Sequence, residues 1–150
     1  MTMKTKILVS ACLLGENCKY NGGNNKDEAV IALGETFELV PICPECFGGL
    51  EIPRVPSEIS GDRVVSKNGE DVTEQFMDGA EKALYVAMEA NCAAAVLKER
   101  SPSCGCGEIY DGSFSGKTVK GNGITAQLLL DNGIQVFGES RVKKVADLFG

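Results

Sequence analysis

Residues 6–11 read KILVSA, a short apolar run typical of a β-strand, and Gly15 closes the run. Three further runs of this kind follow, at residues 37–42, 93–97 and 134–137. Pro41 weakens the prediction at the end of the second run, because proline cannot donate a ladder hydrogen bond. The chain therefore offers four candidate strands.

Helical patterns separate these strands. The longest predicted helix covers residues 71–91, where Asp71 is the expected cap, Glu74 completes a capping box, and apolar residues recur at helical spacing. Shorter helices are predicted over residues 27–34, 125–132 and 141–149. The alternation of strand and helix predicts an α/β fold of three layers. We expect a parallel sheet of about four strands with helices on both faces, Rossmann-like or flavodoxin-like.

Two segments outside this alternation predict small hairpin insertions. Asn68-Gly69 is a type I′ turn signal within residues 63–72. Residues 108–119 carry two aromatic residues and two glycines, a pattern typical of a hairpin or a lid-like loop. No internal repeat or long linker interrupts the 150 residues, so we expect residues 1–150 to form a single domain.

The composition argues against several classes of protein. A net charge of −6 argues against binding along a nucleic-acid backbone, which requires clustered Lys and Arg. No stretch of about 18 apolar residues occurs, so we expect no membrane span. No signal-peptide pattern follows the charged N-terminus, so we expect a cytoplasmic protein without an export signal.

Seven cysteines and no histidine limit the chemistry that is available. An odd number of cysteines without an export signal argues against a disulfide framework. The lack of histidine removes the commonest general base and every zinc site that contains histidine. Any catalysis must use cysteine, carboxylates, serine, lysine or the backbone.

Most of the cysteines fall just after predicted strands. Five lie in the loops that follow the first three strands: Cys12, Cys43, Cys46, Cys104 and Cys106. Ligands of open parallel sheets bind beyond the carboxyl ends of the strands, so we expect these thiols at one edge of the sheet. Cys18 is expected in a loop near the same site. Cys92, at a helix end beside an alanine run, is expected to be a buried structural cysteine.

Several interpretations of these thiols stay open. Cys43-Pro44-Glu45-Cys46 is a C-x-x-C motif, which supports a thiol oxidoreductase if it begins a helix, but Gly48-Gly49 argues against a helix there. Four cysteines could form a structural zinc site, although such sites usually take local pairs from short hairpins. Thiolates from separate loops also suit an iron–sulfur cluster. A non-catalytic metal-binding or cluster-binding module is a further alternative.

Three motifs carry a family resemblance, and the third is the most specific. They are Ser10-Ala11-Cys12-Leu13-Leu14-Gly15 with Lys19-Tyr20-Asn21-Gly22-Gly23; Cys43-Pro44-Glu45 with Gly49-Leu50 and Pro53-Arg54; and Leu97-Lys98-x-Arg100-Ser101-Pro102-Ser103-Cys104-Gly105. Over about residues 7–137 the chain resembles the short bacterial thiouracil desulfurase family, formerly a domain of unknown function. Larger members carry an additional domain, which we do not expect in this chain.

The resemblance implies a [4Fe–4S] cluster bound by Cys12, Cys43 and Cys104. It implies that the fourth iron is open and takes the sulfur of a thio-nucleobase such as thiouracil, while water converts C=S to C=O. Cys46 and Cys106 are not motif ligands, and Cys46 is a competitor of Cys43 by its position. The implied partners are this small-molecule substrate and the cluster-assembly machinery.

The resemblance also implies roles for polar residues. It places the family glutamate on Glu45 and the family serines on Ser101 and Ser103. Since the chain has no histidine, Glu45 is expected to take the proton of the attacking water. The two serines are expected to hydrogen-bond the substrate or a developing charge. Apart from the resemblance, Asn21, Lys98 and Arg100 are assigned to substrate binding. Lys98 and Arg100 are expected to balance the negative charge of the cluster, and Asn21 with Gly22-Gly23 to allow close backbone approach to a ligand.

Overall fold

A parallel four-stranded sheet forms the centre of the computed structural model, which describes residues 4–150; Met1–Met3 of the predicted domain lie outside the described residues. The order of the strands is β2-β1-β5-β8. Their bounds are Lys6–Ser10 for β1, Glu38–Ile42 for β2, Ala94–Leu97 for β5 and Gln135–Gly138 for β8. Every neighbouring pair is parallel, which confirms the predicted sheet.

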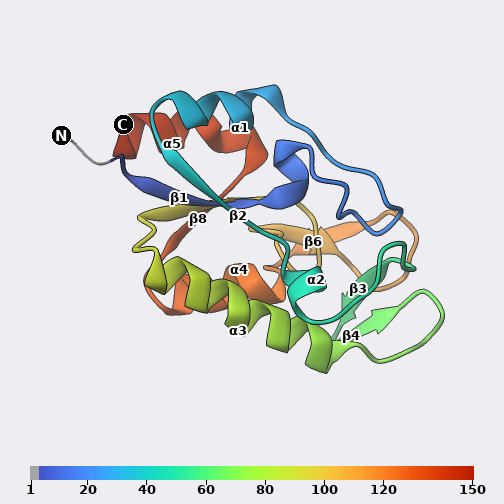
Figure 1. The fold of residues 1–150 in the computed structure, drawn as a ribbon. Coiled ribbons are helices and arrows are strands. Elements are labelled where there is room, and N and C mark those ends of the chain that lie inside the picture. The colour runs from blue at the N-terminus through green and yellow to red at the C-terminus, as the bar shows by residue number, and fades with distance from the viewer. Residues whose placement is uncertain (1–3) are drawn as a thin grey trace.

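Helices cover both faces of this sheet (Figure 1). α1 (Glu28–Ala32) and α5 (Val142–Phe149) lie on one face, and α3 (Thr73–Glu89) and α4 (Ile124–Asp131) lie on the other. Successive strand residues serve opposite faces: Ile7 packs in the core with Val30 and Val145, whereas Leu8 packs in the core with Leu129. The predicted three-layer α/β fold is confirmed. No helix between residues 4 and 150 has the length and apolar character that crossing a membrane requires.

The sequence placed the start of the longest helix too early. α3 begins at Thr73 with Val72 in the cap position, and Asp71 Oδ1 accepts the first backbone N–H of the helix, that of Thr73, at 3.0 Å. Asp71 also forms a single β-bridge with Val65 and accepts a hydrogen bond from Arg63 Nε at 2.8 Å. The predicted capping box of Asp71 and Glu74 is therefore wrong, because Asp71 ends a β-structure rather than beginning the helix.

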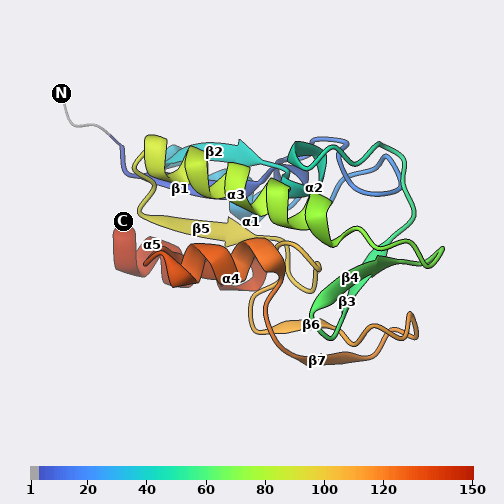
Figure 2. The same ribbon diagram turned by 90° about the horizontal axis from the view of Figure 1, so that it is seen from below.

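Two antiparallel hairpins extend beyond the carboxyl ends of the strands (Figure 2). β6 (Glu108–Tyr110) and β7 (Thr118–Lys120) form the hairpin that the sequence predicts. The other hairpin pairs β3 (Ser57–Ser60) with β4 (Arg63–Ser66) and turns at Gly61-Asp62. The hairpin predicted at Asn68-Gly69 is thus reduced to a turn closed by one bridge, because the chain enters α3 at Thr73, two residues after the bridge at Asp71.

A short helix, α2 (Pro44–Phe47), begins directly after Cys43, which corrects the expectation that Gly48-Gly49 would prevent a helix there. Gly48 serves helix packing instead. A Cβ atom at Gly48 would lie 1.9 Å from the carbonyl oxygen of Gln75 in α3. A Cβ atom at Gly79 would likewise lie 1.8 Å from the carbonyl oxygen of Pro44. The backbones of α2 and α3 therefore touch, and this contact fixes the position of Cys43.

Candidate functional site

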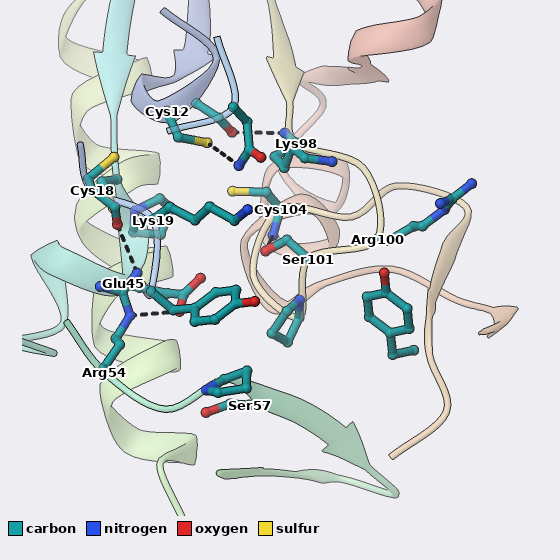
Figure 3. Close-up of a pocket in the computed structure, with 18 of the residues that line it drawn as sticks. Cys12, Cys18, Lys19, Glu45, Arg54, Ser57, Lys98, Arg100, Ser101 and Cys104 are labelled. Carbon is teal, nitrogen blue, oxygen red and sulfur yellow. Dashed lines mark hydrogen bonds and ion pairs between the residues drawn. The ribbon is translucent and has the colours of Figure 1, made fainter. Parts of the chain in front are cut away.

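The strand order creates a crevice at the carboxyl edge of the sheet. β1 lies between β2 and β5, so the chain first adds β2 on one side of β1 and later adds β5 on the other side. Open α/β sheets bind ligands at such a switch point. A cavity of about 510 Å³ lies there, lined by the loops after β1, β2 and β5 and by residues of both hairpins (Figure 3).

Four cysteines line this cavity: Cys12, Cys18, Cys43 and Cys104. Cys12 lies in η1, the short helix Ala11–Leu14 that follows β1, Cys43 lies between β2 and α2, and Cys104 lies in the loop after β5. The sulfur atoms of Cys12 and Cys104 point toward the same part of the pocket in Figure 3. The three predicted ligands thus meet at the expected edge, and their role as ligands stays a prediction. Cys18 lies beside them, as expected from its loop.

Neighbouring donors stabilise two of these thiols as thiolates. Cys18 is the hydrogen-bond partner that contributes most to lowering the pKa of Cys43 to about 5 and that of Cys12 to about 7. Its single S–H donates to one of these two sulfurs at a time. Asn25 Nδ2 contributes by donating to Cys12 Sγ at 3.4 Å. The thiolate is the form that binds metals and attacks electrophiles. Sequence reasoning gave Asn25 no role, because no motif includes it.

Ser101 holds the loop that carries Cys104. Its Oγ accepts the backbone N–H of Cys104 at 3.0 Å and that of Ser103 at 3.1 Å. A serine hydroxyl has two acceptor lone pairs and one donor hydrogen. Both lone pairs are used here, so the hydroxyl of Ser101 can only donate toward the cavity that it lines. Cys104 itself is buried, and burial raises the pKa of its thiol to about 12.

Two residues assigned to the site lie outside the cavity lining. Ser103 is completely buried, and its hydroxyl lies 2.7 Å from that of Thr125 in α4, so it anchors the loop to the helix. Asn21 is exposed, and its Oδ1 accepts the backbone N–H of Gly23 at 2.9 Å, so it shapes a turn. In this structure neither Ser103 nor Asn21 lines the cavity, and their assigned roles stay predictions.

Glu45 lies in the first turn of α2 and faces Arg54 (Figure 3). Arg54 Nε donates to Glu45 Oε1 at 3.2 Å, and Arg54 Nη2 donates to the carbonyl oxygen of Cys18 at 3.0 Å. Burial raises the pKa of the Glu45 carboxyl above its ordinary value, although Arg54 opposes the shift. A carboxyl group with a raised pKa takes up a proton more readily than a solvated one, which suits it to proton transfer. The motif contained Arg54, but its partner was visible only in the structure.

The predicted cations Lys98 and Arg100 do line the cavity. Lys98 Nζ lies 2.9 Å from Glu139 Oε2, and its charge helps to lower the pKa of Cys12. Arg100 Nε lies 3.3 Å from Glu108 Oε1. Each cation therefore has a carboxylate partner outside the pocket lining, so neither pair adds a carboxylate to the three glutamates that already line the cavity, Glu45, Glu58 and Glu99.

The remaining cysteines lie outside the cavity lining. Cys46 is on α2, and burial raises its pKa to about 11. Cys92 and Cys106 pack against the core between the sheet and α3 and α4. Within residues 4–150, no three His, Cys, Asp or Glu side chains are gathered closely enough to hold one metal ion. The structure therefore contains no preformed site for the structural zinc that the cysteine count left open.

Comparison with known proteins identifies relatives over nearly the whole chain. Residues 7–141 match the 2-thiouracil desulfurase family. The uncharacterized protein YbbK of Bacillus subtilis (strain 168) is 44% identical over 149 residues, which cover 93% of this chain and 99% of that protein. A solved structure described as the [4Fe-4S]-dependent thiouracil desulfidase TudS matches with a TM-score of 0.90 and 45% identity, over 95% of this chain and 96% of that one.

Proposed function

The chain belongs to the 2-thiouracil desulfurase family, and on this premise we propose that it removes sulfur from thiouracil or a related thio-nucleobase, with water converting C=S to C=O. One observation carries the proposal. Three motif cysteines from three separate loops line a single cavity together with Glu45 and Ser101. Thiols, a carboxyl and a hydroxyl are the groups that this reaction requires in a chain without histidine.

The donor set of the cavity fits a [4Fe–4S] cluster, held by Cys12, Cys43 and Cys104. Iron–sulfur clusters take cysteine thiolates, and two of these three thiols have a lowered pKa. A cluster contains several irons, so its thiolates would not all bind the same ion, and the lack of a single-ion site within residues 4–150 does not argue against it. When bound, a cluster with three protein ligands supplies an open iron with affinity for the sulfur of the substrate.

Glu45 is the general base in this proposal. Its carboxylate takes a proton from the water that attacks the ring carbon, and the raised pKa suits the protonated form that follows. Arg54 binds Oε1 of this carboxylate and so fixes its orientation. Arg54 also donates to the carbonyl oxygen of Cys18, and this second contact holds Glu45 at a constant position relative to the thiols.

Ser101, Lys98 and Arg100 act on the substrate. The hydroxyl of Ser101 donates a hydrogen bond into the cavity, where it stabilises negative charge that develops on the ring. Lys98 and Arg100 contribute positive charge to a cavity that collects thiolates. The mostly buried pair with Glu139 holds Lys98 in place before the substrate binds, whereas the pair of Arg100 with Glu108 is more than half exposed.

A thiol oxidoreductase is the second candidate, and one observation favours it. Cys43 precedes the first turn of α2, and its pKa of about 5 is typical of the attacking thiol in a C-x-x-C motif. Cys46 would then be the resolving thiol. Replacing Cys46 with serine separates the two functions, because desulfuration in our proposal does not use this residue.

The test is anaerobic reconstitution with iron and sulfide, followed by the visible spectrum and a thiouracil turnover assay. We expect a brown protein that releases uracil and sulfide. Cys12→Ser should lose both colour and turnover, whereas Cys92→Ser, a cysteine outside the cavity, should keep both. A folded wild-type protein that binds no cluster, or that binds one and leaves thiouracil unchanged, would refute the proposal.

A further inference from the structure

The loop between β6 and β7, residues 111–117, contributes an aromatic side chain to the cavity. Phe114 is half-buried and lines the pocket, although it belongs to a hairpin that follows the loop of Cys104. Figure 2 shows this hairpin beside the β3–β4 hairpin, beyond the carboxyl end of the sheet. None of the roles described above uses this residue.

The backbone of Phe114 has an unfavourable conformation. Its φ is +57°, in the left-handed region that bulky L residues avoid. Of the three non-glycine residues with positive φ among residues 4–150, Phe114 and Arg100 line the cavity. The third is Asn91, a residue type that tolerates this region. Strained residues persist only where their surroundings hold them, and they cluster at functional sites.

A buried carboxylate holds the loop in this conformation. Glu58, on β3, is only 9% exposed. Its Oε1 accepts the backbone N–H of Gly112 at 3.0 Å and that of Phe114 at 3.2 Å. A Cβ atom at Gly112 would lie 2.8 Å from the carbonyl oxygen of Ile59, so the loop is pressed against β3. One hairpin therefore positions Phe114 on the other.

We propose that Phe114 determines specificity by stacking its ring on the planar ring of the substrate base, and that Glu58 is the positioning residue that holds it there. This inference rests on the proposed desulfuration of a thio-nucleobase. Most of the polar residues that line the cavity carry thiols, carboxylates or cations, which recognise the charge and the polar edge of a base rather than the face of its ring. Three aromatic rings line the cavity, those of Tyr20, Tyr110 and Phe114. Phe114 alone among them has a backbone in the left-handed region that a buried carboxylate holds, so we assign the stack on the π-face of the base to this ring.

We expect the protein to distinguish an aromatic substrate from a non-aromatic analogue. 2-Thiouracil and 5,6-dihydro-2-thiouracil share the same thioamide edge, but only the first has a flat aromatic ring. The wild-type enzyme should have a lower KM for 2-thiouracil than for the dihydro compound. Phe114→Leu, which keeps an apolar side chain, should remove most of this preference. An unchanged preference in Phe114→Leu would overturn the stacking role.

Binding of uracil to the cluster-loaded protein, measured by calorimetry, gives a readout that is independent of turnover. Phe114→Ala should bind uracil about 5- to 100-fold more weakly, the usual range for loss of a base–aromatic stack. Phe114→Tyr should bind nearly as well as wild type. Val119→Ala is the matched control, since Val119 is exposed on the same hairpin and lies outside the cavity lining.

Phe114→Gly separates binding from stability. Glycine adopts positive φ without strain, so this variant should melt about 2–4 °C above Phe114→Ala. Both variants lack the ring and should bind uracil equally weakly. If uracil affinity instead followed the melting temperature, Phe114 would be a structural residue and the proposal would be wrong.

Glu58 is tested by rescue and by coupling. Glu58→Gln keeps an acceptor oxygen for the two N–H groups and should retain the KM for thiouracil, whereas Glu58→Ala should raise it. Adding Phe114→Ala to Glu58→Ala should raise KM little further, because both changes remove the same stacking contact between Phe114 and the base. Additive effects would refute the positioning role.

The results also separate this inference from the proposed function. If the wild-type protein neither binds uracil nor converts thiouracil, the proposed function fails. If the wild-type protein does both and Phe114→Ala does so equally well, only the stacking inference fails.

Discussion

Arg54 Nε lies 3.2 Å from Glu45 Oε1, and the same guanidinium donates to the carbonyl oxygen of Cys18 at 3.0 Å. One side chain thus joins the proposed base to the loop beside the thiols that we propose as cluster ligands. The side chains of Arg54 and Glu45 are mostly buried, with 10% and 21% of their areas exposed. This geometry allows the proton affinity of Glu45 to be tested by changing Arg54.

Removing Arg54 should shift the pH dependence of turnover. Arg54 lowers the pKa of Glu45 against the effect of burial, so Arg54→Ala should raise that pKa further. A base must be ionised to act, and the acid limb of the kcat profile should therefore move to higher pH, by about 1–3 pH units. Arg63→Ala is the control, since Arg63 pairs with Asp71 away from the cavity. An unmoved acid limb would show that Glu45 does not set it.

Glu45→Gln tests the base directly. Glutamine keeps the shape and the hydrogen bond to Arg54 but cannot accept a proton at neutral pH. We expect the cluster spectrum to persist and sulfide release to fall about 10²- to 10⁴-fold. Full activity would make Glu45 a bystander, and loss of the spectrum would make it structural.

Ser101 and Ser103 should respond differently to replacement by alanine. Ser103→Ala leaves the buried hydroxyl of Thr125 without its partner, which should cost about 1–3 kcal/mol of folding free energy and leave turnover intact. Ser101→Ala removes a donor from the cavity and should lower kcat. Thermal melts and initial rates for the pair check this. Equal effects on kcat would contradict the separation of the two serines.

The thiols of the cluster-free protein should be alkylated in a definite order. At pH 7 iodoacetamide should modify Cys43 and Cys12 first, because their pKa values of about 5 and 7 leave much thiolate. Cys104 and Cys46, with pKa values of about 12 and 11, should react only in alkaline solution. Mass spectrometry of digested protein at several pH values measures each site. Early labelling of Cys104 would contradict the structure.

Much of the fold was predictable from local sequence. The four strands are short apolar runs, and Asp27 caps α1 as a preferred residue type. The turn at Gly61-Asp62 was missed because the β3 sequence, SEIS, is polar and shows no strand pattern. α2 was missed for a tertiary reason, since Gly48 is required by the backbone contact with α3 rather than by a loop.

The site was predictable where strand ends determine it. Cys12, Cys43 and Cys104 follow three parallel strands, so topology alone brings them to one edge. Roles that depend on side-chain direction were less accessible. Ser101 and Ser103 are two residues apart in one motif, yet only Ser101 lines the cavity. The partners Asn25 and Arg54 depend on contacts between loops, which no local pattern encodes.

The central claim is that water replaces sulfur in a reaction that depends on the cavity thiols. The most direct measurement is anaerobic turnover of 2-thiouracil by the reconstituted protein in ¹⁸O-labelled water, with uracil analysed by mass spectrometry and sulfide quantified. The account predicts one ¹⁸O atom in each uracil, one sulfide for each uracil, and neither product with Cys12→Ser. Uracil without the label, or turnover that survives in Cys12→Ser, would contradict it.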